Sequence, residues 1–184
     1  MTSPAKCAIA PAEAADLLYR EGHALDTQRW DDWLALYCED AVFWMPAWKD
    51  EHELTDAPER EVSLMYYTAR AGLEDRVWRV RSGLSTASSP LLRTSHGITG
   101  VVVVGAADGG VAVHGAAEAG DSMETEVHAN WTCHTFNLRD SAQHVFFGRY
   151  EFVLRQEGGA WKIAKKKIVL MNDRIPTMLD FYCV

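Results

Sequence analysis

The stretch from Arg29 to Trp48, RWDDWLALYCEDAVFWMPAW, decides how this chain is organised. Its first half repeats large side chains at the spacing i, i+3, i+4 and i+7, at Trp30, Trp33, Leu34 and Tyr37. This spacing predicts an amphipathic helix, capped by Asp26 or Thr27, whose aromatic face must be buried. The second half contains a short apolar run, residues 41–45, which predicts a strand that Pro46 ends.

Another helix is expected on the N-terminal side of this stretch. Residues 1–9 are expected to form a flexible lead-in, and Pro11 suits the first turn of a helix, where its missing N–H costs nothing. This helix should run to about Leu25. Its apolar stripe is formed by Ala14, Leu17, Leu18 and Leu25.

On the C-terminal side the pattern changes from loop to strand to helix. Lys49–Arg60 has the composition of an exposed loop, and Glu61–Tyr67 resembles a short strand. A third helix is expected over Gly72–Arg81, because Leu73, Val77 and Val80 share one of its faces.

The rest of the chain is strand-like. The expected strands are Thr99–Val104, Val111–Ala117, Met123–Leu138, Gln143–Gln156 and Ala160–Met171. Gly158-Gly159 predicts a hairpin, because glycine adopts the positive φ of tight turns. Helices followed by antiparallel strands predict an α+β domain. We expect a strongly curved, mostly antiparallel sheet around three helices, with bulges or bends at Gly97, Gly100, Gly105 and Gly148.

Length and charge limit the class of protein. The 184 residues fit one domain, 1–184, which ends in an apolar tail, residues 174–184. The net charge of −8 argues against nucleic acid as a partner, and so do the cations, which are scattered except for Lys165-Lys166-Lys167. No run of ~18 apolar residues suggests a membrane span, so we expect a soluble, cytoplasmic protein without a membrane partner.

The cysteines give no sign of a metal or redox centre. They are far apart, at Cys7, Cys38, Cys133 and Cys183. Without a Cys-x-x-Cys pair, neither a zinc site nor an iron–sulfur site is indicated. We therefore expect ordinary reduced thiols.

Several blocks, in this order along the chain, resemble a known family. They are RWDDWLALY (29–37), FWMPAW (43–48), YY (66–67), GLEDRV (72–77), RTSH (93–96) and IVLMND (168–173). They closely resemble β subunits of bacterial aromatic-ring-hydroxylating dioxygenases, most of all the benzoate, toluate and anthranilate group. The resemblance runs from about Leu17 to Phe181, and the order of elements is similar to the nuclear-transport-factor-2-like (cystatin-like) cone.

The resemblance implies a structural role for this chain. In that family three α and three β chains form a hexamer, and each α chain carries a Rieske 2Fe-2S cluster and a mononuclear Fe(II). The chain would then hold no catalytic residue, metal or cofactor of its own. It would trimerise and assemble with the catalytic α subunit, whose substrate would be of the aromatic carboxylate type.

The residues agree with this expectation. A Rieske cluster needs two Cys and two His in closely spaced pairs, and this sequence has no Cys-x-His or Cys-x-x-His pair. A mononuclear iron needs two His and a carboxylate around one open site. One strand face offers such residue types, at Glu126, His128, Asn130, Thr132 and His134. Alternating polar residues more often form a solvated or subunit-facing surface.

Two alternatives use the same fold. Ketosteroid isomerases, scytalone dehydratases and polyketide cyclases place an Asp or a His–Asp pair inside the cone. Here Asp40 with His96 or His128 would serve as acid and base. Such an enzyme should have an open apolar cavity of ~300 Å³ or more in which these groups converge. The second alternative is a free-standing module that binds a small aromatic ligand.

If the function is assembly, interface residues should be recognisable, because interface cores are enriched in Trp, Tyr, Met and Arg. The aromatic candidates are Trp44, Trp48, Tyr66 and Tyr67, and the cationic ones are Arg70, Arg76 and Arg79. The alternative interpretation is that the aromatic residues fill the core and that the arginines lie on a solvated face. Phe181 and Tyr182 are candidates too, because the tail is apolar enough to pack on the domain or on a neighbour.

Overall fold

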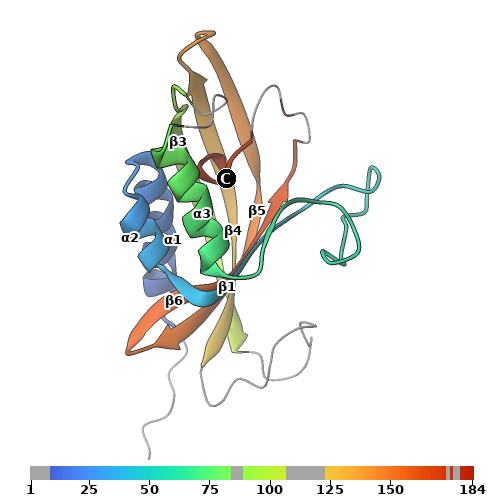
Figure 1. Cartoon of the computed structure of the whole chain (residues 1–184). Coiled ribbons are helices and arrows are strands. Elements are labelled where there is room, and N and C mark those ends of the chain that lie inside the picture. The colour runs from blue at the N-terminus through green and yellow to red at the C-terminus, as the bar shows by residue number, and fades with distance from the viewer. Residues whose placement is uncertain (1–8, 84–88, 107–122, 173–174, 176–178) are drawn as a thin grey trace, which may run out of the picture.

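Three helices lie on one face of a curved six-stranded sheet (Figure 1). The computed structural model describes residues 9–83, 89–106, 123–172, 175 and 179–184. The helices are α1 (Pro11–Asp26), α2 (Trp30–Ala35) and α3 (Arg70–Arg81). The strands are β1 (Tyr37–Pro46), β2 (Ser63–Tyr67), β3 (Arg93–Ala106), β4 (Glu124–Asn137), β5 (Ala142–Glu157) and β6 (Ala160–Leu170). The predicted α+β architecture is confirmed.

The strand order is β2-β1-β6-β5-β4-β3. Among the strands that the structure describes, only β1 and β6 pair in parallel, so the prediction of a mostly antiparallel sheet is correct. Gly158 and Gly159, with φ of 59° and 86°, form the expected turn between β5 and β6. Gly100, with φ of 61°, lies where β3 shifts its register against β4, which confirms a bulge there.

The two ends of the predicted central helix need correction. Neither Asp26 nor Thr27 caps α2, which follows Arg29 without a side-chain cap. Thr27 instead ends α1, where its hydroxyl donates to the His23 carbonyl. Tyr37 begins β1 rather than ending α2, because its backbone position pairs with β6 at Ile163. The helical spacing was right for the buried Trp30 and Trp33 but ran one turn too far.

Strand β3 also differs from the prediction. It begins at Arg93 instead of Thr99, because its first residues pair with the far end of β4, up to Phe136. The strand predicted over Val111–Ala117 lies outside the described residues. The other strand boundaries agree within a few residues.

Alternation along the strands separates an inner from an outer face of the sheet. In β4, Val127, Ala129, Trp131 and Cys133 are buried, while the residues between them are exposed. The inner face packs against the helices, and α1 lies across β3. The final turn, η2 (Phe181–Cys183), is buried, so the described part of the apolar tail packs on its own domain.

Candidate functional site

The interior of the cone holds a buried ion pair between α1 and β6. Glu21 and Lys166 are fully buried, and their charged groups lie 2.9 Å apart. The same Glu21 oxygen accepts hydrogen bonds from Trp33 Nε1 at 2.7 Å and from the Tyr37 hydroxyl at 2.8 Å. Lys166 Nζ also donates to the carbonyl of Val184. The network therefore ties helices, sheet and C-terminal residues together.

Burial sets the electrostatics of this network. It lowers the pKa of Lys166, and the carboxylate of Glu21 acts in the opposite direction. Burial, reinforced by Glu21, raises the pKa of Tyr37 well above its ordinary value. Tyr37 therefore stays a neutral donor. The network pairs Glu21 Oε1 within the chain, whereas Glu21 Oε2 is buried without a hydrogen-bond partner among the described residues.

A second polar pair lies between α1 and β3. Asp26 accepts from the His96 backbone N–H at 2.8 Å, and its other oxygen lies 2.6 Å from His96 Nδ1. Burial acts to raise the pKa of Asp26, but the His96 contacts outweigh it and lower that pKa. The His96 side chain is 1% exposed, and its Nε2 has no hydrogen-bond partner among the described residues. Sequence reasoning had paired His96 with Asp40.

The C-terminal residues fill the space that these groups face. The Phe181 ring lies 4.9 Å from the Trp33 ring and 5.5 Å from the Trp30 ring, measured between centroids. Cys183 and Val184 are fully buried beside them. The apolar interior is therefore packed with the chain's own side chains.

The acid and base candidates do not converge. Asp40 is exposed and forms a bidentate ion pair with Arg155 at 2.8 and 2.9 Å. His128 lies on the outer face of β4, 2.7 Å from Glu126, while His96 is inside. Two hollows formed by described residues, of about 560 and 290 Å³, are lined by neither Asp40 nor His96. The predicted grouping of Asp40 with His96 or His128 is therefore not formed by the described residues. The His–Asp pair inside the cone is Asp26 with His96, and it lines neither hollow.

Among the described residues, one group of potential metal ligands has its donor atoms close together: Cys38, Asp40 and Glu157. The Arg155 guanidinium contacts both carboxylates, at 2.8 and 3.6 Å. Burial raises the pKa of Cys38 to about 12, and Glu157 adds to this effect. A protonated thiol beside a bound guanidinium is a poor metal site, so this cluster is an ion-pair network. Cys38, Cys133 and Cys183 are free thiols, as the sequence predicted.

The aromatic interface candidates lie around the β1–β2 pair. Trp44 is nearly buried on the outer face, where its ring meets Lys165 and Lys167 and its Nε1 donates to Ser63. Trp48 Nε1 donates to the Leu170 carbonyl at 2.7 Å. Tyr66 and Tyr67 in β2 are partly exposed. The indole N–H groups of Trp44 and Trp48 are thus used within the chain.

The arginine candidates are largely engaged within the chain. Arg70 contacts Glu74 at 2.9 Å, and Arg76 forms a 2.7 Å ion pair with the buried Asp180. Arg79 is exposed. Burial of Phe181 and Tyr182 in the core removes them as interface candidates, because a buried ring offers no surface to a partner.

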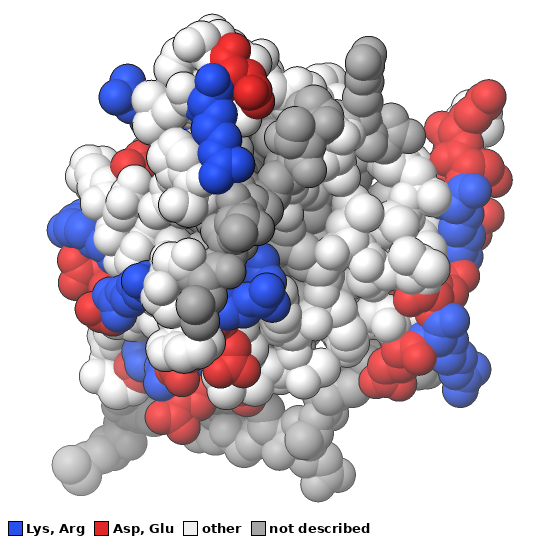
Figure 2. Space-filling model, turned by 45° about the horizontal axis from the view of Figure 1, so that its top comes forward, with Lys and Arg blue, Asp and Glu red and all other residues white. Residues whose placement is uncertain are grey.

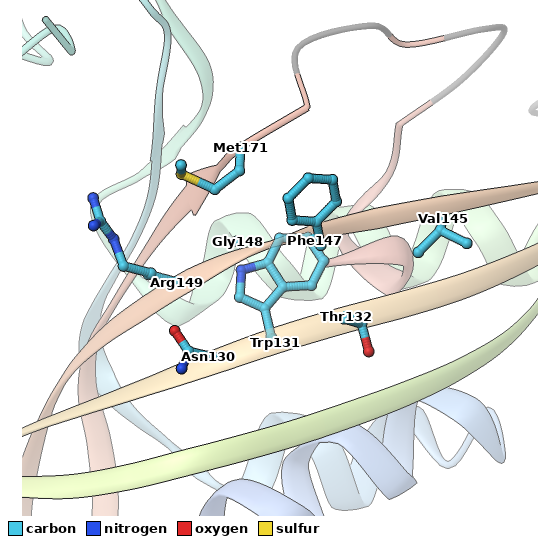
Figure 3. A pocket seen from close by; sticks show the side chains of 8 residues that line it. All are labelled: Asn130, Trp131, Thr132, Val145, Phe147, Gly148, Arg149 and Met171. Atoms are coloured by element: carbon cyan, nitrogen blue, oxygen red, sulfur yellow. The ribbon is translucent and has the colours of Figure 1, made fainter. Parts of the chain in front are cut away.

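The outer face of the sheet holds a feature that sequence reasoning missed. A hollow of about 560 Å³ opens where β4, β5 and the end of β6 meet (Figure 3). Its lining residues are Asn130, Trp131, Thr132, Val145, Phe147, Gly148, Arg149 and Met171. Gly148 allows β6 to approach β5 closely beside the hollow, because a Cβ on Gly148 would lie 1.9 Å from the Val169 carbonyl oxygen. Outward apolar residues in a strand of alternating pattern, such as Phe147, were the available signal.

Comparison with known proteins decides the family. The model described as "Ring hydroxylating beta subunit" matches residues 20–177. The chain belongs to this family. It is 37% identical to the benzoate 1,2-dioxygenase β subunit of Acinetobacter baylyi, over 95% of this chain and 94% of that protein. It is 39% identical to the toluate 1,2-dioxygenase β subunit of Pseudomonas putida, over 92% of this chain and 94% of that protein.

Solved structures agree with this assignment. The crystal structure of the benzoate 1,2-dioxygenase β subunit from Burkholderia mallei superposes with a TM-score of 0.71 at 34% identity. The superposition covers 97% of this chain and 99% of that one. A hexachlorocyclohexane dehydrochlorinase shares the fold at 12% identity and a TM-score of 0.54, covering 88% of this chain and 84% of that one. The ring-hydroxylating β subunit thus has the nuclear-transport-factor-2-like cone that the sequence predicted.

Family membership also sets the functional class. This chain is a β subunit of the aromatic-ring-hydroxylating dioxygenases, which are oxidoreductase complexes, and stands close to the benzoate and toluate group. No helix in the described ranges is long and apolar enough to cross a membrane.

Proposed function

We propose that this β subunit acts by assembly and contributes no catalytic centre. It would bind the catalytic α subunit and associate with two further copies of itself, giving three α and three β chains. The filled cone carries this proposal. Phe181 and Val184 occupy the interior. The buried Glu21 and Lys166 form an ion pair with each other, and Lys166 also donates to Val184. A solid cone is a rigid support for another subunit.

The redox groups of the reaction would belong to the α subunit, as a Rieske 2Fe-2S cluster and a mononuclear Fe(II). Cysteine binds metal as the thiolate. Burial raises the pKa of Cys183 to about 12 and raises that of Cys133 as well. Both are therefore thiols rather than thiolates at neutral pH in the metal-free chain. The chain also offers no Cys-x-His or Cys-x-x-His pair for a Rieske cluster, which supports placing that cluster in the α subunit.

The substrate of the assembled enzyme would be an aromatic carboxylate, converted by dihydroxylation in the cytoplasm. This proposal rests on the relatives, which are named as subunits of benzoate, 2-halobenzoate, toluate and anthranilate 1,2-dioxygenases. Their identities to this chain run from 34 to 39% over at least 91% of it. An aromatic carboxylate is the feature that these named substrates share.

The test is to measure the mass of the purified chain by light scattering, alone and after co-expression with its large subunit. We expect a trimer alone and, with the partner, a hexamer that contains iron and oxidises an aromatic carboxylate. Iron that stays stoichiometric in the chelator-washed chain alone would contradict the proposal. A chain that ignores the large subunit but binds a small aromatic ligand would contradict it too.

A further inference from the structure

A prebuilt arm projects from the sheet between β1 and β2. It comprises residues 47–62 and extends away from the helices (Figure 1). Thr55 joins its two sides, because its hydroxyl accepts from the Ala47 N–H at 3.1 Å and donates to the Val62 carbonyl at 3.0 Å. Lys49 adds an ion pair to Glu61 at 2.8 Å. The arm is thus held in shape by its own contacts, before any partner binds.

The surface of the arm is acidic with an exposed apolar end. Its carboxylates are Asp50, Glu51, Glu53, Asp56, Glu59 and Glu61, against the cations Lys49 and Arg60. Glu51 and Glu59 are exposed and form no ion pair within the described ranges. Val62 is 73% exposed, and Leu64 just beyond it is 40% exposed. The arm therefore presents two exposed apolar side chains and an excess of carboxylates, which complement an apolar surface with a cation at its rim.

The hollow on the outer face has the opposite character. Phe147 and Met171, which line it, are each 45% exposed. Arg149 at its rim is exposed and has no ion pair with any described residue. Figure 2 shows acidic and basic side chains gathered along the right margin of the molecule, beside a surface of largely uncharged residues. The hollow therefore fits an apolar side chain that arrives with a carboxylate beside it.

We infer that the arm of one copy of this chain docks into the outer-face hollow of the next copy. This inference rests on the proposed self-association. The occupant is a second copy because both complementary halves, an acidic apolar arm and a cationic apolar hollow, lie on one chain. Val62 or Leu64 would enter between Phe147 and Met171, and Glu51 or Glu59 would approach Arg149. Such a head-to-tail contact uses two different surfaces, so it can close into a ring of three copies.

The test uses two variants with opposite defects. Val62→Asp damages the arm and keeps the hollow, whereas Phe147→Asp damages the hollow and keeps the arm. Each should raise the concentration needed for half-association of the chain by roughly tenfold or more. Val102→Asp is the matched control, because Val102 is 55% exposed on β3 and belongs to neither surface. Circular dichroism and thermal unfolding of each variant check that the fold is intact.

Mixing the two variants gives the sharpest result. In a head-to-tail contact one intact arm still meets one intact hollow, so an equimolar mixture should form a dimer with one chain of each kind in native mass spectrometry. A mixture that stays monomeric overturns the inference. So does a wild-type chain that is a monomer alone, or a control that dissociates as readily as the two variants.

The large subunit is measured in parallel, which separates the two proposals. If the wild-type chain does not bind the large subunit, the proposed function fails. If Val62→Asp loses the large subunit but self-associates like the wild type, the arm serves that partner and the inference alone is overturned. Expected for the inference is that both variants still capture the large subunit but no longer form the ring of β subunits.

Discussion

Three consecutive lysines on β6 show how differently the two faces of one sheet are used. Lys166 points inward, is fully buried and pairs with Glu21 at 2.9 Å. Lys165 and Lys167 point outward, where both lie over the ring of Trp44, and Lys167 also reaches Glu151. The same residue type thus serves as an internal tie on one face and as part of a solvated surface on the other, because strand side chains alternate.

The comparison extends to the whole sheet. On the inner face, polar groups such as Glu21 and Asp26 meet partners inside the chain, and Phe181 closes the space. On the outer face, Phe147 and Met171 stay uncovered. The inner face therefore stabilises the fold, and the outer face is available for association.

The largest contrast is expected within the lysine run itself. Lys166→Ala should lower the free energy of unfolding by about 3–5 kcal/mol, because Glu21 would be left as a buried charge without its partner. Lys167→Ala, the matched control, should cost less than ~1 kcal/mol, since its pair with Glu151 is partly exposed. Urea unfolding followed by tryptophan fluorescence measures both. Equal losses of unfolding free energy in the two variants would show that the buried pair contributes no more to stability than the exposed one.

A smaller contrast is expected between two aspartates. Asp26→Ala removes the acceptor of two hydrogen bonds from His96, one from its backbone N–H and one from its almost completely buried ring. The substitution should lower the free energy of unfolding by about 1–3 kcal/mol. Asp40→Ala, which breaks a surface pair with Arg155, should cost ~1 kcal/mol or less. Thermal unfolding of the two variants under one buffer condition provides the comparison. A larger loss at Asp40 would contradict it.

The smallest effect concerns the arm. The hydrogen bond from Lys49, together with the N–H groups of Ala57 and Asp56, lowers the pKa of Glu61 from 4.5 to about 2. Because the folded pKa lies below the ordinary value, this stabilisation is complete above about pH 4.5 and is lost as the pH falls towards 2. The contacts of Glu61 that hold the arm in shape should therefore weaken in acid.

An NMR titration of the Glu61 carboxyl group measures this effect. We expect a midpoint near 2 in the wild-type chain, and a higher midpoint in Lys49→Met, which lacks the first of these causes. The amide signals of Asp56 and Ala57 should move together with the carboxyl group. A midpoint at the ordinary value of 4.5 would mean that the arm is not held in this shape in solution.

Much of the fold could be predicted from local patterns. Pro11 at the start of α1, the buried Trp30 and Trp33, and the turn at Gly158 depend on neighbouring residues alone. The errors arose where a distant segment competes with the local pattern. Tyr37 fits a helical spacing but joins β1, because β6 provides a strand to pair with.

The site was less predictable than the fold. The sequence named His96 as a polar residue of interest but not its partner Asp26, which looked like a helix cap. The apolar tail predicted Phe181 and Tyr182 as interface candidates, but both side chains are buried in the core of this chain. Arm and hollow come from segments far apart in the chain, so no local pattern could join them.

By itself, the sequence determined the family and the α+β cone, because these depend on residue types and patterns along the chain. Only the tertiary structure decided that the cone is filled and that a hollow opens on its outer face. It also decided which of three consecutive lysines is an internal tie. The physical reason is that burial and pairing depend on contacts between residues such as Glu21 and Lys166, 145 positions apart.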